Sequence, residues 1–176
     1  MAKQATQGFL ARITGGTKQM FGLAVSAGAA DAGKIPALGT DGRFDTSLMP
    51  VGIGANTTIA TASEAIGAGK FVNFHSNGGL LGVRLADNNN GRQADGYVKD
   101  AVANAAAATV YPLDTTNTAL SGLTPGGRYW LGTAGGVIAA ALDATDIDNA
   151  GKVCQELGVA KSATELLTDD LGFVVL

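Results

Sequence analysis

From about residue 57 to the end of the sequence, short apolar runs alternate with clusters of turn-forming residues. The clearest example spans residues 70–85, in which two such runs flank Asn77 and Gly78. Within residues 81–85 every second position is large and apolar, as in a strand with one buried face. This pattern predicts a β-hairpin with an Asn-Gly pair at its tip.

Further strands are predicted at similar spacing along the same region. Their ranges are 96–103, 107–113, 128–131, 137–140, 152–161 and 165–167, and residues 173–176 form an apolar terminus. Pro125 and Gly126 predict a type II turn, because proline fixes φ and glycine tolerates positive φ. Many short strands without helical periodicity predict a mainly all-β fold, a small antiparallel β-barrel or sandwich over residues 57–176.

Residues 1–56 differ, because glycine is frequent and apolar residues occur without a period. Glycine at this density disfavours long regular elements, since it loses much backbone entropy on folding. Disordered segments lack large apolar residues, however, and this segment contains many. We therefore expect a long, irregular N-terminal arm and connector that orders against its own barrel, a sister subunit or a capsid. The predicted apolar anchors of the arm are Phe9, Leu10, Ile13, Phe21, Ile35, Leu38, Phe44, Leu48 and Met49.

Composition strengthens the expectation of packing against partners. Hydrophobic types make up 46% of the 176 residues, but aromatic types make up only 6% and there are 26 glycines. Burial of apolar surface stabilises a fold by roughly 25 cal/mol per Å², and small side chains bury little area, so each of them contributes little. We therefore expect much of the stability to come from contacts with copies of the chain or with a larger partner.

Charge and hydropathy narrow the range of partners. The 12 basic and 15 acidic residues give a net charge of −3, and no cluster of Lys or Arg offers the footprint of a nucleic-acid site. The N-terminus lacks the apolar segment of a signal peptide, and no apolar run is long enough for a membrane span. We therefore expect that the protein binds neither nucleic acid nor membranes. We also expect that it is synthesised in a cytoplasm.

Residues with chemical potential are few. Cys154 is the single cysteine, which excludes an internal disulfide and is interpreted as a small buried hydrophobe. His75 is the single histidine, so a site with two histidines is excluded, and a surface position near the hairpin tip is expected. A Cys-His pair would require these two residues to meet in space. We predict no enzymatic activity, no catalytic residues and no cofactor.

Two loops partly match ligand-binding motifs. Residues 67–70 end in Gly-Lys, but Glu64 and Phe71 stand where a phosphate-binding loop requires Gly and Ser or Thr, so a turn entering a strand is predicted. Residues 146–157 begin like a calcium loop, but Leu157 replaces the bidentate carboxylate at its last position. We interpret the acidic residues 143–150 as a solvated loop and predict no metal site, leaving weak cation binding there open.

Several stretches resemble known virion proteins. Residues 31–38 (DAGKIPAL) and 41–50 (DGRFDTSLMP) resemble a connector of phage fibre and capsid-surface proteins. Residues 71–73, 83–87, 91–98, 108–111, 120–131 (LSGLTPGGRYWL) and 159–166 resemble the small β-domain of head-decoration and related surface proteins of tailed phages. The resemblance implies a capsid decoration (cement) subunit on the virion surface, which binds the major capsid protein and forms a homo-oligomer, with a trimer favoured.

Two other functions remain open. The connector-like stretch also fits a head-fibre or tail-fibre component, although the sequence contains no coiled-coil heptads or shaft repeat. A glycan-binding or hydrolytic module would need acids clustered with aromatic residues. Arg128, Tyr129 and Trp130 approach that composition, but neighbouring strand residues point to opposite faces, so a core or interface role for Trp130 is favoured.

Overall fold

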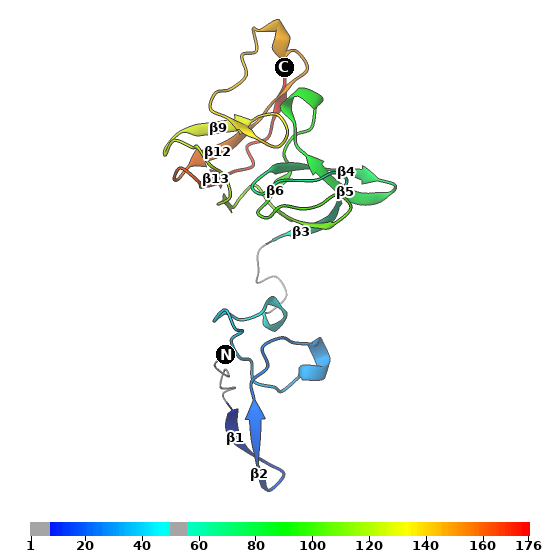
Figure 1. Cartoon of the computed structure of the whole chain (residues 1–176), viewed down its shortest axis with the longest axis vertical. Coiled ribbons are helices and arrows are strands. Elements are labelled where there is room, and N and C mark those ends of the chain that lie inside the picture. Colours follow the sequence, from blue (N-terminus) through cyan, green and yellow to red (C-terminus); the bar gives the residue numbers. More distant parts are fainter. Residues whose placement is uncertain (1–7, 50–55) are drawn as a thin grey trace. The chain divides into compact units, whose positions relative to one another are not determined.

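The computed structural model describes residues 8–49 and 56–176, apart from the side chains of Phe9, Ile13 and Thr46. It divides the chain into two units, residues 1–55 and residues 56–176 (Figure 1). The regular elements in the described residues are β-strands and short 3₁₀ turns, which confirms the all-β prediction.

The first unit contains β1 (Gly8–Ile13), β2 (Gly16–Phe21) and the 3₁₀ turns η1 (Gly28–Asp31) and η2 (Thr46–Leu48). The second unit contains twelve strands and two 3₁₀ turns. They are β3 (Thr58–Ala62), β4 (Phe71–Asn77), β5 (Leu80–Leu85), η3 (Asn88–Asn90), β6 (Gly96–Val98), β7 (Ala107–Tyr111), β8 (Thr116–Asn117), β9 (Arg128–Leu131), β10 (Val137–Ile138), η4 (Ile147–Asn149), β11 (Val153–Cys154), β12 (Glu156–Ala160), β13 (Leu166–Thr168) and β14 (Val174–Val175).

Five strands of the second unit form a closed barrel in the order β3-β5-β4-β6-β7. All neighbours are antiparallel except β3 and β5, which run parallel and close the barrel. The barrel interior is filled mainly by alanine and valine, which suits the narrow lumen of a five-stranded barrel. Its buried members are Ala60, Ala62, Ile66, Val72, Val83, Val98, Ala108 and Val110.

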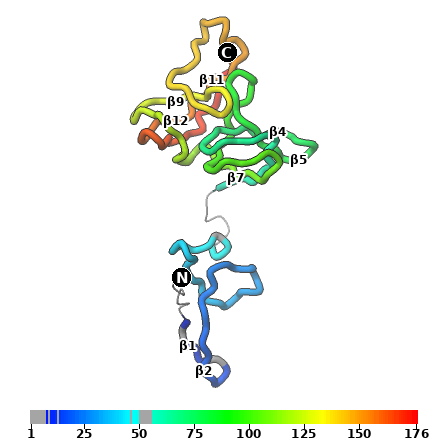
Figure 2. Tube along the Cα trace, viewed as in Figure 1, coloured from blue at the N-terminus to red at the C-terminus, as the bar shows by residue number. Residues whose placement is uncertain are grey.

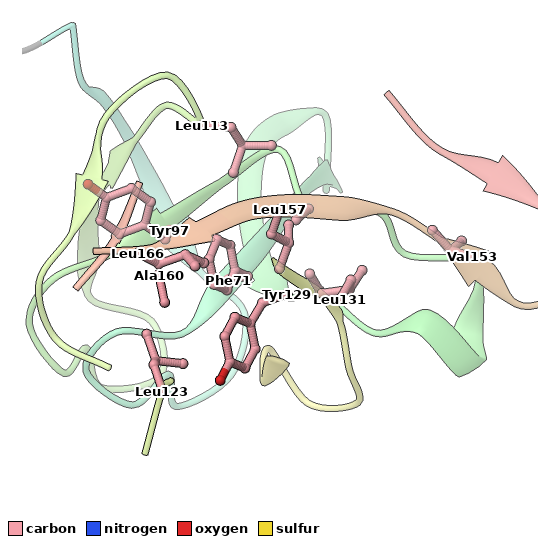
Figure 3. Close-up of a cluster of buried hydrophobic side chains, with 12 residues drawn as sticks. Phe71, Tyr97, Leu113, Leu123, Tyr129, Leu131, Val153, Leu157, Ala160 and Leu166 are labelled. Carbon is pink, nitrogen blue, oxygen red and sulfur yellow. The ribbon is translucent and has the colours of Figure 1, made fainter. Parts of the chain in front are cut away.

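The remaining strands of the second unit form a five-stranded sheet, ordered β10-β9-β12-β13-β8, and a two-stranded ribbon of β11 and β14. A second core cluster joins the barrel to this sheet (Figure 3). Phe71 and Tyr97 enter this cluster, whereas the next residues along their strands, Val72 and Val98, point into the barrel. The two-residue period of a strand therefore lets β4 and β6 serve both cores.

The turn chemistry explains where several strands end. The β4–β5 turn consists of Gly78 and Gly79, with φ of 61° and 85°, and not of the predicted Asn77-Gly78 pair. The prediction is wrong by one residue, because a two-residue turn with positive φ at both positions is least costly for glycine. The predicted type II turn is confirmed by the positive φ of Gly126 and by a 2.9 Å hydrogen bond from Gly127 N to Thr124 O.

The predicted strand 152–161 is divided by Gln155 into β11 and β12. Gln155 is 2% exposed, and its side-chain amide both accepts from Ala94 N at 2.7 Å and donates to Ala94 O at 2.9 Å. The amide thus takes the place of a strand partner for Ala94, which precedes β6. This contact connects the barrel region to the sheet through hydrogen bonds as well as through apolar packing.

Candidate interaction surface

The described part of the first unit starts with a hairpin of β1 and β2 (Figure 2), and the two strands are paired along their whole length. The two turn residues, Thr14 and Gly15, have φ of 49° and 82°, as a type I′ turn requires. The ring of Phe21 covers Gly8, since a Cβ atom added there would lie 3.1 Å from the ring. No larger sheet extends this hairpin within the described residues.

Polar contacts hold the loops that follow the hairpin. Leu23 N donates to Ile35 O at 2.8 Å, and Ala37 N donates to Leu23 O at 2.8 Å. The Asp31 carboxylate accepts from Ala27 N at 2.6 Å across the start of η1. These bonds fix the path of the backbone locally, without a contribution from a hydrophobic core.

No buried side chain occurs among the described residues of the range 8–49. Both core clusters belong to the second unit. An isolated two-stranded hairpin is only marginally stable in water, because it cannot bury an apolar face. The first unit therefore leaves many of its large apolar side chains exposed, where a partner can cover them.

The predicted anchors can be compared with this surface individually. Six of them are exposed by at least 40%, namely Leu10, Phe21, Ile35, Leu38, Phe44 and Met49, whereas Leu48 is half-buried. The side chains of Phe9 and Ile13 lie outside the described part of the structure. The role of these residues in binding a partner stays a prediction.

A hollow of about 570 Å³ lies on the first unit beside two exposed apolar residues, Val25 and Phe44. Asp41, Arg43 and Asp45 also line it. Val25 was not among the predicted anchors. Its 61% exposure makes it part of the same apolar surface.

The second unit has an apolar surface of its own in residues 169–175, which we call the C-terminal patch. Leu171, Phe173, Val174 and Val175 are exposed by 47% to 62%. Two exposed acids, Asp169 and Asp170, precede them. The patch therefore combines exposed apolar side chains with two carboxylates.

A cleft of about 480 Å³ adjoins the C-terminal patch. Asp95, Asp114, Asp170 and Phe173 are among its lining residues, and none of the residues that line it is basic. Burial raises the pKa of the Asp95 carboxyl above its ordinary value, even though Phe74 N donates to it at 2.7 Å, and the negative charge of Asp170 adds to the rise. The cleft therefore brings three carboxyl groups together with an aromatic ring and no basic side chain.

The single histidine and the single cysteine lie on different strands. His75 is on β4, with Nε2 3.2 Å from Ser63 Oγ and with Nδ1 buried and unpaired among the described atoms. Cys154 is on β11 opposite Val174, and it is half-buried, so the prediction of a buried cysteine is wrong in degree. Its exposure follows from its place in a two-stranded ribbon.

The glycine-lysine loop and the acidic loop have structural roles. Gly69 has a φ of 72°, and its carbonyl accepts from Asn117 Nδ2 at 2.9 Å, as in a turn that leads into β4. Asp143 and Asp146 accept hydrogen bonds from amides of their own loop, at 2.8 Å and 3.0 Å. Within the described ranges, no group of three His, Cys, Asp or Glu residues could hold a metal ion.

The aromatic pair at residues 129–130 lies on β9. Tyr129 is buried, and its hydroxyl accepts from Thr124 N at 2.8 Å, whereas Trp130 is half-buried. The two rings therefore differ in exposure, as strand alternation predicts.

None of the helical turns in the described residues has the length and hydropathy to cross a membrane.

No protein-family model matches the sequence, and no curated protein matches it at a significant level. The chain is similar to a solved structure described as the head fiber gp8.5 N base in bacteriophage phi29, with a TM-score of 0.41 and 16% sequence identity. The similar region covers 64% of this chain and 92% of that chain. A TM-score below 0.5 does not establish a common fold.

Proposed function

We propose that the protein is a structural component of a tailed-phage virion, a capsid decoration (cement) subunit that binds the outer surface of the head between major capsid proteins. The observation that carries the proposal is the first unit, whose described side chains include exposed apolar residues and no buried ones. A segment of this kind gains stability by lying on another protein. The second unit contains both hydrophobic cores.

The assignment to a phage virion is supported by the sequence resemblance described above. Residues 31–38 and 41–49, the described part of the stretches that resemble the connector of phage surface proteins, lie in the loops of the first unit, and residue 50 lies outside the described residues. Residues 120–131, which resemble the β-domain of head-decoration proteins, include the type II turn and β9 of the second unit. The two resemblances thus fall on the two structural units.

The mechanism of such a subunit is thermodynamic linkage. A protein that binds only the assembled shell stabilises that shell by RT ln(1 + [L]/Kd), roughly 3 kcal/mol at a hundredfold excess over Kd. The exposed anchors Ile35, Leu38, Phe44 and Met49 would bury apolar area on the shell, at roughly 25 cal/mol per Å². Repetition over many equivalent positions would let a modest gain per site resist the pressure of packed DNA.

The test is binding to empty heads purified from the same phage. Deletion of residues 2–50 should leave a folded second unit, by circular dichroism and thermal melting, that no longer sediments with the heads. Ile35→Ser with Leu38→Ser in the full chain should weaken binding at least roughly tenfold. Ile59→Ser is the matched control, because Ile59 is 72% exposed but belongs to the barrel. Unchanged binding by the deletion variant would refute the role of the first unit.

A head-fibre or tail-fibre component is the second candidate, and the division of the chain into two units favours it. In that case the first unit would attach a distal domain to the particle. Electron microscopy of virions labelled through the second unit distinguishes the two functions. Label distributed over the head surface supports decoration, and label confined to fibres or to the tail supports the second candidate.

A further inference from the structure

The two units carry opposite net charges. Residues 1–55 contain five basic residues and three acidic ones, a balance of +2. Residues 56–176 contain the remaining seven basic and twelve acidic residues, a balance of −5. The sum equals the net charge of −3, which conceals this asymmetry.

The positive charge of the first unit is concentrated on the hairpin. Residues 8–21 include Arg12 and Lys18 and no acidic residue. Leu10 and Phe21 are 75% and 53% exposed, and Arg12 is exposed as well. In the register of the hairpin, Leu10 pairs with Gln19 and Gly8 pairs with Phe21. Strand alternation therefore places Leu10, Arg12, Gln19 and Phe21 on one side, which we call the hairpin face.

The C-terminal patch and its cleft are complementary to the hairpin face in both charge and polarity. Asp95, Asp114 and Asp170 line the cleft, and none of them forms an ion pair with a described residue. Phe173 lines the same cleft and is 47% exposed. An arginine entering such a cleft would neutralise its carboxylates, while Leu10 and Phe21 could cover the exposed apolar side chains.

We propose that the hairpin face of one copy docks on the C-terminal patch of a second copy, with Arg12 directed into the acidic cleft and Phe21 against Phe173. The contact joins two different surfaces, so it is heterologous and generates a ring when the rotation closes. This inference rests on the proposed function for its biological setting. In this arrangement the hairpin mediates self-assembly, and the residues that contact the shell are Ile35, Leu38, Phe44 and Met49.

The test is the mass of the full-length protein by light scattering and sedimentation over a range of concentration and salt. Arg12→Glu should raise the dissociation constant of the oligomer roughly tenfold, because it replaces an attraction with a repulsion. Asp170→Lys should have a similar effect, and the double variant with both changes should regain assembly. Arg43→Glu and Asp100→Lys are the matched controls, because both residues are exposed and lie outside the proposed contact.

Three outcomes would overturn the inference. A monomer at all concentrations whose radius changes in Arg12→Glu would show that the hairpin docks on its own barrel. Loss of shell binding in Arg12→Glu with unchanged self-association would assign the hairpin to an acidic surface of the shell. Lack of rescue in the charge-swapped double variant would refute the pairing of Arg12 with Asp170. Shell binding by the wild-type chain is measured separately, so the proposed function can stand when this inference fails.

Discussion

Gly158 provides the sharpest test of the fold, because β12 lies between β9 and β13 at this point. Its φ is 138°, a region that residues with a side chain rarely adopt. A Cβ atom at this position would lie 2.9 Å from the carbonyl carbon of Leu167 and 3.1 Å from Thr168 Cα, and closer still to the Leu167 oxygen. All of these atoms belong to the backbone of β13, so no side-chain rotation can relieve the overlap.

The cost of Gly158→Ala follows from these contacts. Carbon atoms in van der Waals contact are about 3.5 Å apart, so β13 would have to move away from β12 by a substantial fraction of an ångström. Overpacking of this kind costs about 1–3 kcal/mol, and the strained φ adds about 1–2 kcal/mol. We expect a total loss of about 3–4 kcal/mol in the free energy of unfolding, a large part of the stability of an ordinary domain.

The matched control is Gly126→Ala. Gly126 also has positive φ, 80°, but a Cβ atom there would have no neighbour within 4 Å. This variant should therefore lose only about 1 kcal/mol, from backbone strain. Urea unfolding can be followed through Trp130, the single tryptophan, which is paired with Glu156 next to the affected strand. A difference of about 2 kcal/mol between the free energies of unfolding of the two variants corresponds to a difference of about 1 M in their urea midpoints. Equal midpoints for the two variants would refute the close packing of β12 against β13.

Other expectations concern the core and the buried polar groups. Leu131→Ala should lower the free energy of unfolding by about 3 kcal/mol, because Leu131 is fully buried, whereas Ile59→Ala should change it by less than about 0.5 kcal/mol; urea titration compares the two. Gln155→Met should cost about 2–4 kcal/mol in the same titration, since both backbone groups of Ala94 lose their partner, and a neutral result would contradict the role of Gln155 as a connection. The pKa of Asp95 is higher in the folded state than its ordinary value of 3.8. The contribution of this carboxyl to the free energy of unfolding is therefore most favourable below pH 3.8, and it declines as the pH rises through the folded pKa. The difference in urea midpoint between wild type and Asp95→Asn should therefore vary with pH in that window and be constant above it; a difference that is constant throughout would show that burial does not perturb Asp95.

Local patterns predicted part of this fold. The β4–β5 hairpin, the type II turn at Gly126 and the strand 128–131 follow from alternation and turn residues, which act over a few positions. The parallel pairing of β3 with β5 could not be predicted in this way, because it depends on contacts between distant segments. The division at Gln155 also escaped prediction, since the partner of its amide is 61 residues away along the chain.

The N-terminal hairpin was not predicted because Phe9, Leu10, Ala11 and Ile13 give no two-residue alternation. Only the turn residues Thr14 and Gly15 indicate it. The exposure of the predicted anchors followed from a simpler argument, since apolar residues without a period cannot all face a common core. The C-terminal patch was visible in the sequence as an apolar run after two acids, but its exposure depends on the ribbon of β11 and β14.

The adjacent residues Phe71 and Val72 have a consequence for how the second unit unfolds. They belong to different hydrophobic clusters, so β4 cannot lose its packing in one cluster and keep its packing in the other. The barrel and the five-stranded sheet should thus melt in a single cooperative transition, with hydrogen-exchange rates in their central strands converging on one global value.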